Sequence, residues 1–109
     1  MQGIDFFLRK CVDSGASDLH FKADTGKAYL RINGDLEIFE GVETFDPEEF
    51  RDALFEILKR EQITRFEEEL ELDFAYEIKG VSRFRGNAYQ QRGVIQAAFR
   101  VIPYAIQSM

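Results

Sequence analysis

The chain has 109 residues, of which 45% are hydrophobic, so it can build one domain around a single core. Its formal net charge of -6 disfavours indiscriminate binding to nucleic acid or anionic lipid, because phosphates repel a negative surface. Cys11 is the single cysteine, no run of about 18 apolar residues occurs, and the first residues lack the features of a signal peptide, so we expect a cytoplasmic protein without direct membrane insertion.

The first expected elements are an amphipathic helix and two short strands. Apolar residues recur at helical spacing between Ile4 and Val12, and Gly15 can end the helix in a left-handed conformation. Residues 18–23 and 28–32 have the composition of strands and are separated by the turn formers of residues 24–27. We expect these two strands to form a hairpin.

A second turn comes before a third strand at residues 36–39. A three-residue loop, 33–35, would place Leu30 opposite Ile38, whereas a two-residue loop would place Leu30 opposite Glu37. Because apolar residues are expected to face one another, the pattern favours the three-residue loop.

Two helices are expected in the middle of the chain. Asp46, Pro47 and Glu49 supply an N-cap, a first-turn proline and the acidic partner of a capping box. Apolar residues then continue at helical spacing as far as Leu58. A third, shorter helix follows, with apolar positions at Ile63, Phe66 and Leu70.

The last third of the chain alternates apolar and polar residues, as strands do. Three such runs cover residues 72–78, 82–91 and 94–102. The whole pattern predicts an α+β domain in which helices cover mainly one face of an antiparallel sheet. Residues 103–109 have the composition of a tail or linker.

The last two strands contain the most informative arrangement of charges. With the hairpin tip at residues 92–93, the apolar positions of both strands meet on the core face, and Arg85 lies directly opposite Arg100 on the other face, with Arg83 two residues along. Like charges opposed on a sheet are destabilising, so the pair needs solvation, acidic neighbours or a bound anion such as phosphate. Residues 81–109 contain four arginines and no acidic residue, while the rest of the chain is acidic, so neutralisation across the fold is also open.

Six motifs, in order along the chain, resemble those of the amino-terminal domain of type IV pilus retraction ATPases of the PilT kind. Together they span almost the whole chain. Relatives that drive pilus extension and type II secretion share fewer of them, and the paired Arg83 and Arg85 favour the retraction branch. The motifs are Gly15–His20, Leu30–Leu36, Leu72–Tyr76, Gly80–Arg85, Gln91–Gly93 and Ala98–Pro103.

The resemblance implies a PAS-like fold over residues 1–103, with residues 104–109 as the start of a linker to a RecA-like ATPase domain outside the chain. It implies a homohexamer in the type IV pilus machinery, at the inner face of the cytoplasmic membrane, that uses ATP and magnesium for pilus retraction and twitching motility. In that ring the domain packs on the RecA-like domains of its own and neighbouring subunits. Arg85 and Arg100 fall on family arginines that reach the nucleotide phosphates, and Arg83 is a third candidate.

The sequence departs from a complete ATPase and from the family pattern at two places. The Gly-Lys pair at Gly26 is followed by Ala28, so the phosphate-binding pattern GxxxxGK[ST] is not matched, and we expect neither catalysis nor a cofactor in these 109 residues alone. Gly86 stands where the family usually has a β-branched residue. Because glycine weakens a strand or marks a bulge, this departure bears on the direction in which Arg85 points.

Other functions stay open at this level. The domain could belong to a related pilus-extension or type II secretion ATPase, or it could be a free-standing PAS-like module, which would need an internal ligand pocket. Residues 85–89 loosely resemble an RNA-binding stretch, but net acidity and the lack of a second suitably spaced aromatic argue against a nucleic acid partner. Asp18 and His20 share a strand face, yet no nucleophile is placed to complete a triad, so a structural role is favoured.

Overall fold

The computed structural model describes residues 1–103, and these residues form one antiparallel sheet with helices on one side. The expected linker segment, residues 104–109, lies outside the described residues. The helices are α1 (Ile4–Asp13), α2 (Pro47–Ile57) and α3 (Arg60–Glu69), and the strands are β1 (Asp18–Lys22), β2 (Lys27–Ile32), β3 (Asp35–Ile38), β4 (Glu71–Ile78), β5 (Ser82–Gln91) and β6 (Val94–Ile102).

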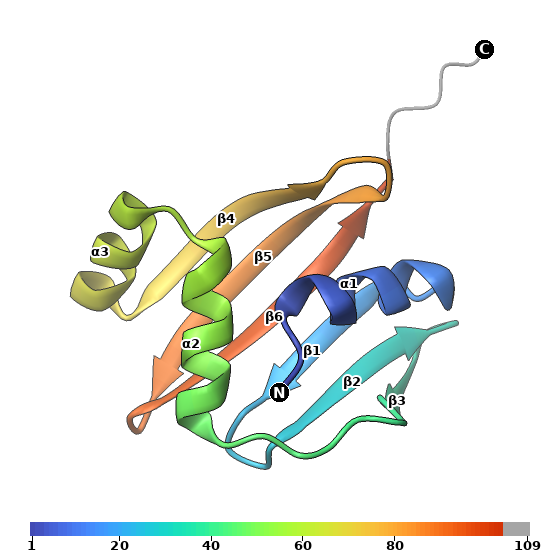
Figure 1. Ribbon diagram of the computed structural model, residues 1–109, viewed down its shortest axis with the longest axis horizontal. Coiled ribbons are helices and arrows are strands. Elements are labelled where there is room, and N and C mark those ends of the chain that lie inside the picture. The colour runs from blue at the N-terminus through green and yellow to red at the C-terminus, as the bar shows by residue number, and fades with distance from the viewer. Residues whose placement is uncertain (104–109) are drawn as a thin grey trace.

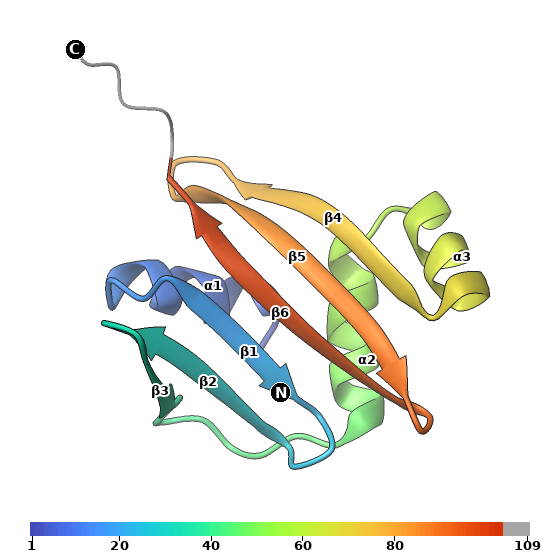
Figure 2. The ribbon, with the colours of Figure 1, turned by 180° about the vertical axis from the view of Figure 1, so that it is seen from behind.

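The sheet order is β3-β2-β1-β6-β5-β4, and every neighbouring pair is antiparallel. The first and last strands of the sequence, β1 and β6, therefore lie side by side in the middle. Helices α1 and α2 lie across one face of the sheet, and α3 lies beyond the edge strand β4 (Figure 1). The view from behind shows the strands in front of the helices, so this second face is the uncovered sheet face (Figure 2). The expected α+β class is confirmed.

The helices begin and end where the sequence signals indicate. In α1, the side chains that face the sheet are buried, and Gly15 follows the helix with a φ of 73°. Helix α2 begins with the full capping box, because Asp46 Oδ1 accepts from the Glu49 amide at 2.8 Å and Glu49 Oε1 accepts from the Asp46 amide at 3.0 Å. The expected place of Leu70 in the third helix is wrong: it follows α3 in a left-handed conformation and is 46% exposed.

Phenylalanine rings fill the space between the sheet and the helices. Phe21 of β1 lies at the centre, with its ring centroid 5.1 Å from that of Phe7, 4.9 Å from that of Phe50 and 6.0 Å from that of Phe99. These rings come from α1, α2, β1 and β6, so one aromatic cluster joins both helices to the two central strands. Within residues 1–103, no helix combines the length and apolar character needed to cross a membrane.

The loop before β3 differs from the expectation. Leu30 pairs with Glu37, and Tyr29 pairs with Ile38, so the turn holds two residues rather than three. Asn33 and Gly34 have φ values of 53° and 85°, which is the conformation of the two-residue turn that best matches strand twist. The turn chemistry decided the register, and as a result Ile38 lies on the uncovered sheet face with 46% of its surface exposed.

Candidate functional site

Strand register brings four charged residues into one line across the uncovered sheet face. Arg31 of β2 pairs with Asp18 of β1, Asp18 pairs with Arg100 of β6, and Arg100 pairs with Arg85 of β5. We call these four residues the arginine row. The expected register of the last hairpin is thus confirmed, and the row contains three arginines and one carboxylate, which leaves an excess of positive charge.

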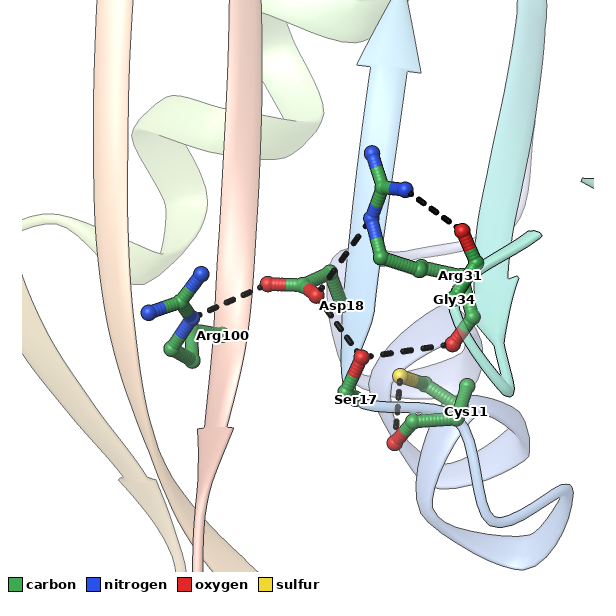
Figure 3. A network of polar contacts seen from close by, with 7 residues as sticks. Cys11, Ser17, Asp18, Arg31, Gly34 and Arg100 are labelled. Atoms are coloured by element: carbon green, nitrogen blue, oxygen red, sulfur yellow. Dashed lines mark hydrogen bonds and ion pairs between the residues drawn. The ribbon is translucent and has the colours of Figure 1, made fainter. Parts of the chain in front are cut away.

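Asp18 is the fixed point of the arginine row. It is 8% exposed, and its carboxylate accepts hydrogen bonds from the Ser17 hydroxyl at 2.8 Å and from Arg100 Nε at 3.1 Å (Figure 3). Burial works to raise the pKa of Asp18, but the hydrogen bonds from Ser17 and Arg100 and the charge of Arg100 outweigh it and lower the pKa. The carboxylate is therefore ionised at neutral pH.

The two arginines beside Asp18 are held differently. Arg31 Nε lies 3.8 Å from Asp18 Oδ2, and Arg31 Nη1 donates to the carbonyl oxygen of Gly34 at 3.0 Å, so the β2–β3 turn also binds this guanidinium. Arg100 uses Nε for Asp18, and its terminal nitrogens lie on the side away from the carboxylate (Figure 3). The Arg100 side chain is 71% exposed. Its terminal nitrogens are available to a ligand.

Arg85 completes the row without a directly paired carboxylate, because Asp73 and Glu77 of β4 occupy the diagonal positions on either side. Its direct neighbours across the strands are Ala75 of β4 and Arg100 of β6. Within the part of the chain that the structure describes, its guanidinium has no ion pair or hydrogen bond. Arg100 is therefore paired directly with a carboxylate, that of Asp18, whereas Arg85 has acidic residues only at diagonal positions.

Arg83 lies two residues from Arg85 on the same face, opposite Glu77 of β4. Both arginines line a groove of about 410 Å³ over β4 and β5. The structure thus brings the three arginines of the sequence analysis to one face, and Arg83 also has an acidic neighbour. The other residues that line the groove are Asp73, Phe74, Ala75, Phe84 and Ile102.

Gly86 does not introduce a bulge, so the direction of Arg85 is well defined. Pairing is continuous along β5 on both sides, with Gly86 between Phe74 of β4 and Phe99 of β6. A Cβ at this position would lie 2.7 Å from Phe74 Cε2 and 2.9 Å from Cε1, and closer still to Cζ. Glycine is therefore present because the Phe74 ring occupies the space that a side chain would need.

His20 lies on the same sheet face as the arginine row but outside it. It is half-buried and sits between Tyr29 and Ala98 in the register. Burial lowers its pKa, and the charges of Arg31 and Lys22 act in the same direction, against the opposing effect of Asp18. Neither strand neighbour is a serine or a cysteine. Among residues 1–103, no group of histidine, cysteine and acidic side chains is arranged to hold a metal ion.

Sequence reasoning missed the contact between Asp18 and Arg100. It gave Asp18 a structural role and assigned it no ion pair. The alternation of β1 was a usable signal, because Asp18 must lie on the face opposite Leu19. The pairing of β1 with β6 was not available, since it joins residues 82 positions apart without a connecting turn.

Comparison with models of known protein families gave no match. The chain is 36% identical over 95 residues to the type IV pilus retraction ATPase PilT of Pseudomonas aeruginosa, a match that covers 87% of this chain and 27% of that protein. It is 29% identical over 103 residues to the type IV pilus ATPase PilU of the same organism, with 94% of this chain and 26% of PilU covered. A twitching motility protein of Neisseria gonorrhoeae is 30% identical over 80 residues.

Solved structures give the same result. A crystal structure of the pilus retraction motor PilT with bound ADP superposes with a TM-score of 0.88 at 28% identity, over 98% of this chain and 31% of that chain. The Legionella pneumophila ATPase DotB shares the fold, with a TM-score of 0.73 at 24% identity. The chain spans about a quarter of the length of the curated relatives that it matches. Over most of its length, this chain is thus a homologue of the PilT and PilU type IV pilus ATPases.

Proposed function

We propose that the chain is the amino-terminal domain of a hexameric type IV pilus retraction ATPase and has no hydrolytic activity by itself. The similarity to PilT and PilU over most of this chain, and over about a quarter of theirs, supports this proposal. In the intact ATPase, ATP and magnesium bind to the RecA-like domain. The amino-terminal domain packs on the RecA-like domains of its own and the neighbouring subunit. The intact protein works in the cytoplasm, at the inner face of the membrane.

We further propose that Arg85 and Arg100, with Arg83 beside them, contact the phosphates of that nucleotide. The observation that carries this proposal is the direct opposition of Arg85 and Arg100 on an uncovered face, where Arg100 is bound to Asp18 through Nε alone and Arg85 has no ion pair among the described residues. A polyphosphate would satisfy this excess positive charge, because guanidinium groups bind phosphate oxygens through paired N–H donors.

The chemical role of the arginines follows from their charge. Phosphoryl transfer places negative charge on the transferred group and on the leaving oxygen, and fixed positive donors stabilise that charge. Because the arginines stand on a separate domain, they reach the phosphates in one relative position of the two domains and leave them in another. Hydrolysis and release of product would then be coupled to movement of this domain, which is what a retraction motor needs.

The test is steady-state ATP hydrolysis by the intact ATPase carrying Arg85→Ala or Arg100→Ala. Each variant should lower kcat/KM. The loss can reach the order of a thousandfold if the arginine stabilises the transition state, and is smaller if it only binds nucleotide. Arg65→Ala is the matched control, because Arg65 is an exposed residue of α3 whose pair with Glu69, at 3.6 Å, contributes little to stability. If kcat/KM is unchanged in both variants, in an assay that does detect inactive variants of the ATPase, the phosphate role is rejected.

A further inference from the structure

We propose that Asp18 is a positioning residue for Arg100: it holds Nε of the guanidinium so that the two terminal nitrogens face the phosphate. This inference rests on the proposed phosphate role of Arg100. It adds a residue that does not touch the nucleotide and that acts through the side chain that does.

Asp18 is suited to this task because it is itself held in place. The backbone of its neighbour Ser17 is hydrogen-bonded to two strands. The Ser17 amide donates to the carbonyl oxygen of Arg31 at 2.9 Å, and the Ser17 carbonyl oxygen accepts from the Val101 amide at 3.0 Å. The Ser17 hydroxyl then donates to the Asp18 carboxylate at 2.8 Å. These contacts join the start of β1 to the ends of β2 and β6, so the carboxylate stands at a fixed place beside Arg100.

A contact that restricts the Arg100 side chain lowers the entropy cost of binding a ligand through it. That side chain is 71% exposed, and a free arginine at such a position samples many rotamers. The guanidinium has donors on Nε and on two terminal nitrogens in one rigid plane. When Asp18 binds Nε at 3.1 Å, the plane is fixed while the terminal pair is left for a phosphate (Figure 3). Part of the ordering cost of ligand binding is then met before the ligand arrives.

The alternative is that Asp18 merely neutralises its two arginine neighbours, Arg31 and Arg100. The two roles give opposite signs for one substitution. Asp18→Asn keeps the shape of the side chain, removes its negative charge and replaces the charge-assisted hydrogen bond to Arg100 Nε with a weaker neutral one. If Asp18 only neutralised, this change would strengthen the attraction of the row for an anion. If Asp18 positions Arg100, the change weakens anion binding even though the site becomes more positive.

The experiment measures kcat/KM for ATP in the intact ATPase with Asp18→Asn, with Arg100→Ala and with both, together with the melting temperature of each variant. We expect Asp18→Asn to lower kcat/KM about threefold to tenfold, the effect of losing one preordered side chain. In the Arg100→Ala background it should change nothing further, because its target is gone. Asp35→Asn is the matched control. It removes the same charge from the edge strand β3, on the other face of the sheet, and should leave kcat/KM unchanged.

A second variant keeps the test decisive if Asp18→Asn fails to fold. Arg100→Lys retains the charge but has one charged nitrogen, which cannot bind Asp18 and a phosphate in the same fork geometry, so it should lose as much kcat/KM as Arg100→Ala. Suppose that Arg100→Ala lowers kcat/KM. The positioning role is then overturned, and the phosphate role stands, if Asp18→Asn raises kcat/KM or leaves it unchanged, or if Arg100→Lys has the wild-type kcat/KM. If Arg100→Ala itself has no effect, the proposed function of Arg100 fails and this inference fails with it.

Discussion

Replacement of Gly86 by alanine should destabilise the domain, because the new methyl group would enter the Phe74 ring. Phe74 cannot simply swing outward. It is 7% exposed, and its ring packs edge to face on Phe99 with centroids 5.7 Å apart. The added Cβ would lie within 3 Å of three ring atoms, closer than real Cβ contacts come, so the ring and its neighbours must shift.

The size of the effect follows from two opposing contributions. Overpacking a core costs about 1–3 kcal/mol. Removing the conformational freedom of a glycine from the unfolded chain returns about 0.4–1 kcal/mol. The net loss in the free energy of unfolding is about 1–2 kcal/mol, which corresponds to a fall in Tm of about 5–15 °C for a domain of this size.

The assay is thermal and urea denaturation of the 109-residue chain followed by circular dichroism. Phe74→Leu provides the control background, because leucine lacks the Cε and Cζ atoms that the new methyl group would meet. In that background, Gly86→Ala should cost much less than it does in the wild type, which a double-mutant cycle measures. A Gly86→Ala variant that melts at the wild-type temperature would refute the steric explanation.

Three further predictions concern charge and assembly. Arg85→Ala should leave the Tm unchanged or raise it slightly, because it relieves a like-charge pair. Arg100→Ala should instead lower the free energy of unfolding by up to about 1 kcal/mol, because Asp18 loses a hydrogen-bond donor. Equal melting temperatures of the two variants would contradict this asymmetry. Because the pKa of Asp18 is lowered in the folded state, its contribution to stability is present above its unfolded pKa and is lost as the pH falls through the folded pKa. Urea titrations between neutral pH and about pH 3 should therefore show a smaller loss of unfolding free energy for Asp18→Asn than for wild type. Parallel curves for the two proteins would contradict this pH dependence. The 109-residue chain should be a monomer or weak dimer by light scattering at micromolar concentration, because the proposed ring contacts involve the ATPase domain; a stable hexamer would show that this domain assembles without it.

Local signals in the sequence were sufficient for most of the fold. The capping box at Asp46 and Glu49 marked the start of α2 directly. The β5–β6 register could be predicted because a two-residue turn at residues 92–93, with φ values of 55° and 80°, fixes every pair along the hairpin. The opposition of Arg85 and Arg100 followed from that turn and from strand alternation alone.

The prediction for the β2–β3 loop was wrong because it assumed that apolar side chains face a core. Strand β3 is at the edge of the sheet, and no part of it is buried. Leu36 and Ile38 therefore exerted no packing preference on the register, and the turn residues Asn33 and Gly34 determined it. Similarly, no local rule relates Asp18 to Arg100, whose contact depends on the meeting of the first and last strands. Half of the candidate site was thus beyond what sequence patterns alone could give.

A structure of the intact ATPase bound to magnesium and a non-hydrolysable ATP analogue would show directly whether Arg85 and Arg100 contact the nucleotide. We expect terminal nitrogens of Arg85 and Arg100 to lie within hydrogen-bond distance, about 2.7–3.2 Å, of phosphate oxygens in at least one subunit, while Arg100 Nε stays bound to Asp18. A structure in which every subunit holds nucleotide and both guanidinium groups face solvent or protein carboxylates, with the phosphates bound entirely by other residues, would contradict this expectation.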